Sequence, residues 1–128
     1  MPAREDFQYA IVRVVPRVER GESLNVGVVL FCRRLGFLAA RTELDEPALR
    51  ALAPDCDGAE VRPQLETIEC VAAGEPSGGP IAALPPSERF HWLTAPSSTI
   101  VQASPVHTGL TDDPAAELDH LFARLVER

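Results

Sequence analysis

The chain has 128 residues, of which 45% are hydrophobic, and a formal net charge of −7. This length fits a single domain with one core, which we expect to span residues 1–128, and the apolar content excludes wholesale disorder. All twelve basic residues are Arg. Chemistry that needs a Lys, such as a Schiff base, a Ser–Lys dyad or a Walker-type phosphate loop, is therefore excluded.

The sequence carries no signal for a membrane or secreted protein. Its longest apolar run, residues 26–32, is far shorter than the roughly 20 residues of a membrane-spanning helix. The first residues, MPAREDFQ, are charged and lack a secretory core. The cysteines, Cys32, Cys56 and Cys70, match neither a disulfide framework nor a paired-Cys zinc site. We expect a cytoplasmic protein without a bound metal or cofactor.

Three strands are expected near the N-terminus. Residues 8–16 are rich in β-branched side chains and end at a Pro, and residues 24–34 and 37–44 follow after short polar connections. The short connections predict an antiparallel meander. The second strand is apolar at successive positions, so both of its faces should be buried. Either helices cover both faces or a second copy covers one, which predicts a homodimer. Gly27 suggests a bulge or a close backbone approach.

Helices are expected in the middle and at the end of the chain. The first should begin at Asp45 and stop at Pro54, and the second should end at Gly74. The last should be capped by Asp112 or Asp113. Residues 74–80 are too rich in Gly and Pro for regular structure. The expected buried faces are Leu49 and Leu52, then Val61, Leu65, Ile68 and Val71, and finally Leu118, Leu121, Phe122, Leu125 and Val126.

Residues 89–114, RFHWLTAPSSTIVQASPVHTGLTDDP, combine a Trp, two His, seven hydroxyl side chains and two Asp. We interpret them as a short helix over 88–93 capped by Ser87, a strand over 98–103 and a return loop. Most of the hydroxyls would then serve as caps and turn-formers. The predicted fold is α+β, with an antiparallel sheet of the N-terminal meander plus a strand near 99–104, packed with three to four helices.

The same segment holds the candidate catalytic residues. If the strand near 99–104 joins the sheet, His91 and His107 could approach each other and, with Asp112 or Asp113, form a cluster for acid–base chemistry or metal binding. The spacing of the two His matches no defined metal motif, and half-buried structural His residues are commoner. A small hydrolase or nuclease-like enzyme that uses these groups is therefore the alternative hypothesis.

The candidate binding residues lie near the first hairpin. Arg13 and Arg17 could oppose Glu22 and Asn25 in a polar pocket, although a solvated turn whose ion pairs contribute about 0–1 kcal/mol each is the interpretation that we favour. Trp92, the single Trp of the chain, is a further candidate.

The charge is divided unevenly between the two parts of the chain. Residues 1–41 have a net charge of +3 and residues 42–128 a net charge of −10. Such asymmetry can mark a nucleic-acid surface, or acidic helices can cover and neutralise a basic sheet. We favour the second interpretation and expect no nucleic-acid partner. The residues that such a surface would use are Arg13, Arg17, Arg33, Arg34 and Arg41.

Two segments, YAIVRVVPRVERGESLNVGVVLF (9–31) and RFHWLTAPSSTIVQASPVHTGLTDDP (89–114), resemble a bacterial family known as domain-of-unknown-function family 3037. The resemblance covers nearly the whole chain and is least distinct over 42–84. It implies no established activity, cofactor or catalytic residue. Members of that family are often encoded beside a HipA-like kinase, which implies a protein partner. The function that we expect is a non-catalytic interaction or regulatory domain.

Overall fold

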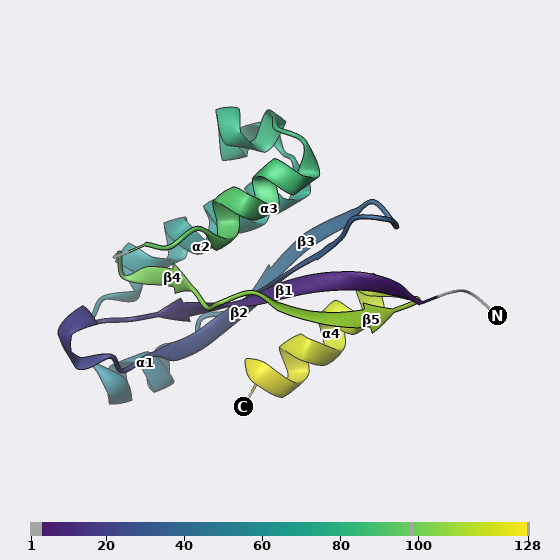
Figure 1. Ribbon diagram of the computed structural model, residues 1–128. Helices are drawn as coiled ribbons and strands as arrows, with labels where there is room; N and C mark the ends of the chain where they lie inside the picture. Colours follow the sequence, from purple (N-terminus) through teal and green to yellow (C-terminus); the bar gives the residue numbers. More distant parts are fainter. Residues whose placement is uncertain (1–3, 98, 128) are drawn as a thin grey trace.

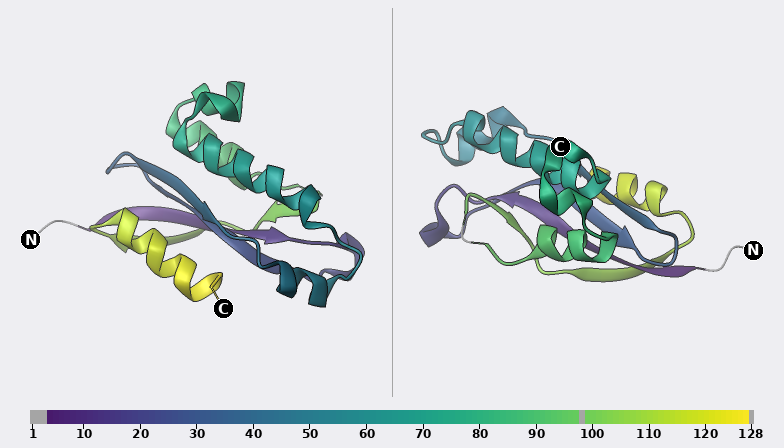
Figure 2. Two further views of the ribbon diagram at one scale, coloured as in Figure 1. Left: turned by 180° about the vertical axis from the view of Figure 1, so that it is seen from behind. Right: turned by 90° about the horizontal axis from the view of Figure 1, so that it is seen from above.

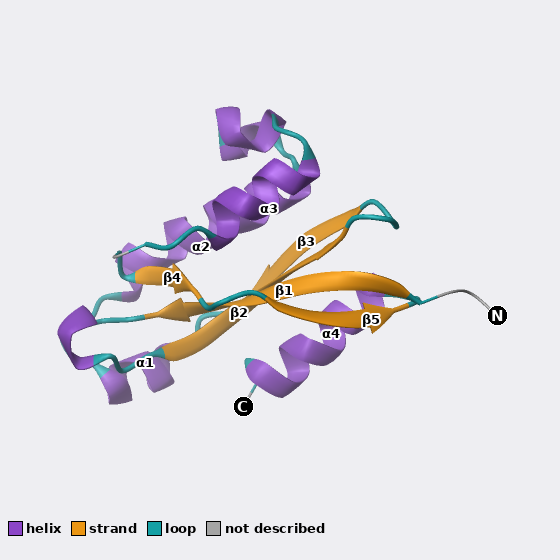
Figure 3. Ribbon diagram, viewed as in Figure 1, coloured by secondary structure: helices purple, strands orange, loops and turns teal. Residues whose placement is uncertain are grey.

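The computed structural model describes residues 4–97 and 99–127. Five strands form one antiparallel sheet, and helices pack against it (Figure 1, Figure 3). The strands are β1 (Glu5–Val14), β2 (Leu24–Cys32), β3 (Phe37–Thr42), β4 (Val101–Ala103) and β5 (His107–Thr111). The helices are α1 (Glu46–Leu52), α2 (Gly58–Ala73), α3 (Pro86–Thr94) and α4 (Pro114–Leu125), with short 3-10 helices at Val18–Arg20, Pro76–Gly78 and Pro80–Ala83. The predicted α+β class is confirmed.

The sheet has the order β3-β2-β1, and β4 and β5 pair one after the other with the remaining side of β1. The N-terminal meander and the strand near 99–104 are therefore confirmed. Ser98, with which the fourth strand was expected to begin, lies outside the described residues. The return loop was predicted wrongly, because residues 107–111 form β5, with Glu5 opposite Thr111 and Tyr9 opposite His107.

Ser104 marks the break between β4 and β5. It is 2% exposed, and its backbone N–H donates to the carbonyl of Ile11 at 2.8 Å. Its hydroxyl accepts from the Ile11 N–H, also at 2.8 Å. Pro105 follows and has no N–H of its own, so it cannot continue a strand ladder. The Ser104 side chain thus replaces a backbone acceptor where the strand is interrupted.

Helices of the same chain cover both faces of β2. Val28, Leu30 and Cys32 pack in one cluster with α4, whereas Val29 and Phe31 pack in another with α2 and α3. Figure 2 shows α4 on the opposite side of the sheet from α2 and α3. The prediction that β2 is buried on both faces is confirmed. Because helices do this on both sides, β2 gives no reason to expect a second copy.

A bulge at Gly27 redirects the start of β2. Val12 pairs with Gly27 and the next residue, Arg13, pairs with Asn25, so Val26 is an extra residue in β2. A side chain at Gly27 would place its Cβ 2.8 Å from the carbonyl oxygen of Arg41. Both the bulge and the close backbone approach that Gly27 predicted are present.

Two of the predicted side-chain caps are present, at the starts of α1 and α4. The Asp45 carboxylate accepts from the N–H of Ala48 at 3.0 Å, and Asp113, not Asp112, caps α4. The cap expected from Ser87 is wrong, because α3 begins at Pro86 without any side-chain cap. Residues 74–80 are also more regular than expected, since Pro76 and Pro80 each begin a 3-10 helix with the fixed φ of proline.

Candidate functional site

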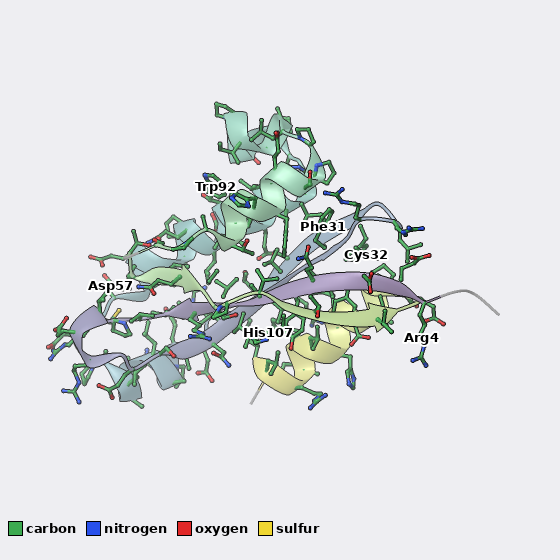
Figure 4. The ribbon with its side chains drawn as sticks, viewed as in Figure 1. Arg4, Phe31, Cys32, Asp57, Trp92 and His107 are labelled. Carbon is green, nitrogen blue, oxygen red and sulfur yellow. The ribbon has the colours of Figure 1, made fainter. Side chains whose placement is uncertain are left out.

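An open pocket of about 400 Å³ lies between α2, α3 and the β1–β4 part of the sheet. Its apolar wall includes Ile68 of α2, Leu93 of α3 and Val101 of β4. The half-exposed Trp92 stands at its rim, and Figure 4 shows this side chain on α3. None of the described residues that line this pocket is charged. We call it the Trp92 pocket. Its volume falls within the roughly 300–1,000 Å³ of typical ligand pockets.

The packing of α3 explains why Trp92 is available. Phe90 and Leu93 are buried against the sheet and α2, and Trp92, on the adjacent helical face, remains 44% exposed. Arg89 fixes α3 against the end of α2, where its guanidinium donates to the carbonyl oxygens of Val71 at 2.9 Å and Ala72 at 2.7 Å. The Val71 carbonyl also accepts from the N–H of Gly74, whereas the Ala72 carbonyl lies in the last turn of α2, which has no further helical N–H to bond to it. The bonds from Arg89 position the rim of the pocket.

The polar side chains around the pocket bond mainly to the protein backbone. The Gln64 amide donates to the carbonyl of its own helix at Glu60, and the Gln102 amide donates to the carbonyl of Thr99. The Thr99 hydroxyl donates to the carbonyl of Val101 at 2.8 Å. These groups are committed within the chain, so the pocket offers mostly apolar surface. It suits an uncharged group, because a buried charge without a partner costs several kcal/mol.

The structure does not bring the candidate catalytic residues together. His91 is exposed on α3. His107, on β5, has its ring centroid 5.2 Å from that of Tyr9, and Tyr9 packs against the cluster beneath α4. The two His side chains therefore belong to opposite faces of the sheet. We expected the two His residues to approach each other if the strand near 99–104 joined the sheet. That strand does join the sheet, but α3, which carries His91, packs on one face and His107 points to the other face.

Asp112 and Asp113 are also separated from His107. The Asp113 carboxylate accepts from the N–H of Ala116 at 3.1 Å and so has a structural role as a helix cap. Asp112 is exposed at the end of β5, and His107 begins that strand, which at about 3.4 Å per residue puts them roughly 17 Å apart. Within residues 4–97 and 99–127, no group of three or more His, Cys, Asp or Glu could hold a metal ion.

The candidate binding residues of the first hairpin lie apart from the Trp92 pocket. Arg13 and Asn25 are cross-strand neighbours, and the Asn25 amide donates to the carbonyl of Leu125 at the end of α4. Arg17 forms an exposed ion pair with Asp55 at 3.4 Å. Glu22 pairs with Arg20, also at the surface. Exposed pairs of this kind contribute about 0–1 kcal/mol. Of the candidate residues, Trp92 alone lines this pocket.

The basic N-terminal part is partly neutralised by later acidic residues. Arg41 pairs with Asp119 at 2.9 Å and with Glu127 at 3.7 Å, and its guanidinium lies 4.2 Å from the ring centroid of Phe122. The pair of Arg17 with Asp55 follows the same pattern. This arrangement agrees with acidic helices that cover a basic sheet.

One pKa shift is resolved near the surface. Partial burial, followed by the nearby Glu60 and Asp57 carboxylates, raises the pKa of the Cys56 thiol above its ordinary value. A raised pKa leaves less thiolate at neutral pH and makes a poor nucleophile. Cys56 therefore lacks the properties of a catalytic cysteine.

The geometry defines an α+β chain with an antiparallel sheet, helices on both of its faces and an apolar pocket. The chain belongs to the family described as Protein of unknown function (DUF3037), whose model matches residues 9–126. No curated protein and no solved structure matches the chain. Within the described part of the chain, no helix has the length and hydropathy needed to cross a membrane.

Proposed function

We propose that the chain is a non-catalytic regulatory interaction domain that binds a partner protein by accepting one apolar side chain of that partner into the Trp92 pocket. The observation that carries this proposal is an uncharged pocket with a half-exposed Trp at its rim. Trp is among the residues that most often dominate binding energy at protein interfaces, especially beside pockets from which water is excluded.

The character of the pocket favours an apolar side chain as its occupant. A charged group would lose its hydration without gaining a charged partner from the lining, whereas an aliphatic or aromatic group would gain about 25 cal/mol for each Å² that it buries. The net charge of −7 favours basic residues around that side chain in the partner, because opposite charges accelerate association.

The partner that we propose is a HipA-like kinase, as the resemblance to this family implies. The kinase would supply an exposed segment with an apolar side chain, and binding would regulate its activity. The alternative of a small hydrolase that uses His91, His107 and Asp112 or Asp113 has no converging groups in its favour.

The test is direct binding between the purified chain and a HipA-like kinase from the same genome. Replacement of Trp92 by Ala should weaken binding by at least about 2 kcal/mol, or roughly 30-fold in Kd. Leu110→Ala is the matched control, because Leu110 is 57% exposed and lies outside the pocket. This control should change Kd by no more than about twofold.

Because Trp92 is the single Trp, its fluorescence reports on the pocket directly. Kinase binding should shift its emission to the blue as water leaves the indole. No binding, or equal losses in the Trp92 and Leu110 variants, would refute the proposal.

A further inference from the structure

The two edges of the sheet differ in how well they are protected. The β4–β5 edge is interrupted at Ser104 and Pro105, and the Thr99 hydroxyl already occupies the carbonyl of Val101. The other edge is β3, Phe37–Thr42, which contains no Pro and a single charged residue, Arg41. Natural edge strands are usually blocked by charges, prolines or bulges, because an open edge pairs with other strands. Strand β3 shows little of this protection.

Some backbone N–H and C=O groups of β3 point away from β2, and the hydrogen bonds between the two strands show which ones. The N–H of Glu43 donates to the carbonyl of Val26 at 2.7 Å, so residue 43 faces β2. Successive residues of a strand direct their backbone groups to alternate sides. Leu38 and Ala40 therefore direct their N–H and C=O groups away from β2, along an edge that has no strand partner in the described chain.

This edge is also held rigidly from both faces of the sheet. Thr42 is hydrogen-bonded to Glu69 of α2, and Arg41 is paired with Asp119 of α4 on the other face. A strand that is already ordered loses little further entropy when it binds. It is therefore preorganised for strand addition.

The charges that flank β3 identify the strand that would be added. Arg33 comes just before it, and Glu43 just after it. The other charges nearby are used within the chain, because Arg34 and Glu46 form ion pairs and Asp45 caps α1. Neither Arg33 nor Glu43 has an ion-pair partner within the described residues. In an antiparallel pair of identical strands, the basic end of each copy lies opposite the acidic end of the other. A parallel pair would instead place like charges together.

We propose that β3 pairs antiparallel with β3 of a second copy of this chain, joining two five-stranded sheets into one. A two-fold axis near Ala39 would place Leu38 opposite Ala40 of the second copy, so the outward backbone groups of both strands meet. This interface differs from the dimer that the sequence predicted, in which a second copy would cover one face of β2. It does not involve the Trp92 pocket.

The first test is Ala40→Pro, measured by sedimentation equilibrium on the full chain at tens of micromolar. Proline removes an outward N–H and spares the bonds between β3 and β2, since edge strands tolerate proline at such positions. The wild-type chain should be a dimer, and the Pro variant a monomer with an unchanged circular dichroism spectrum. A wild-type monomer at these concentrations would overturn the proposal.

The second test reverses the flanking charges and does not depend on how the Pro variant folds. Arg33→Glu and Glu43→Arg should each weaken dimerisation by about tenfold or more, because they create like-charge contacts at both ends of the pair. The double variant, with both charges exchanged, should restore the dimer to within about threefold of wild type. A dimer that persists in the single variants, or a double variant that shows no recovery, would contradict this interface. Trp92→Ala should leave dimerisation unchanged, so the two proposals can fail separately.

Discussion

Replacing Ser104 by Ala tests how the chain closes the gap between β4 and β5. The hydroxyl accepts from the N–H of Ile11 at 2.8 Å and donates to the carbonyl of Pro105 at 2.9 Å, and the residue is 2% exposed. Alanine fits the space but leaves the Ile11 N–H without this acceptor. A buried donor that loses its partner costs about 1–3 kcal/mol, and we expect about 2 kcal/mol of destabilisation.

Urea unfolding followed by circular dichroism measures this effect. With a slope of about 2 kcal/mol per molar urea, the unfolding midpoint should fall by about 1 M while the slope stays unchanged. Ser23→Ala is the matched control, because Ser23 is exposed between β1 and β2, and it should change stability by less than about 0.5 kcal/mol. If both variants shift the midpoint equally, the Ser104 hydroxyl does not stabilise the connection between β4 and β5, and this account of the two strands is wrong.

Three further predictions concern packing, helix docking and thiol chemistry. Gly109→Ala should destabilise the fold by about 1–3 kcal/mol, because the new Cβ would lie 2.6 Å from the ring of Phe7; thermal unfolding measures this. Arg89→Lys should cost about 2 kcal/mol in the same assay, because one ammonium cannot reach both the Leu84 carbonyl, which accepts from the Arg89 Nε–H, and the end of α2, where a terminal guanidinium nitrogen donates to Val71 and Ala72. Cys56 should be alkylated more slowly by iodoacetamide at pH 8 in the folded than in the unfolded chain, and Glu60→Gln should accelerate the reaction by lowering the raised pKa of Cys56.

Each of these predictions has a result that would count against it. An Ala at position 109 that leaves the melting temperature unchanged would mean that Phe7 has room to move. A Lys at position 89 with wild-type stability would show that α3 docks without a side chain that bonds to Leu84 and to the end of α2 at the same time. Equal alkylation rates for folded and unfolded Cys56 would show that neither burial nor the nearby carboxylates act on the thiol.

The elements that the sequence predicted well are those whose signals are local. The apolar run of β2 predicted burial on both faces. Asp45 and Gly74 marked helix ends, the first through its side-chain cap and the second through its left-handed backbone. Gly27 indicated a bulge because a close approach requires a residue without a side chain. None of these predictions depended on knowing which distant segment lies nearby.

Strand β5 was missed because its order depends on a distant partner. HTGLT alternates poorly, and Leu110 and His107 are both exposed, so no hydrophobic period distinguishes the segment from a loop. Its conformation comes from pairing with the start of β1, about a hundred residues earlier, and Gly109 packs against Phe7. The same limitation applies to the Trp92 pocket, whose walls come from α2, α3 and β4. The one local signal was Trp92 itself, within a helix that also carries the more deeply buried Phe90 and Leu93.

The covering of β2 by helices of its own chain decides what kind of association this protein can form. Its core is covered by its own helices, so neither of the two partners that we propose is needed to shield apolar side chains. In an obligate dimer, by contrast, the partner completes the core. The associations that we propose instead use surfaces that remain after folding: the uncharged pocket beside Trp92 and the backbone edge of β3. Such contacts gain less apolar burial than a shared core, so they form and dissociate between chains that stay folded. That property suits the regulatory role that we propose, because occupancy would then follow the concentration of the partner.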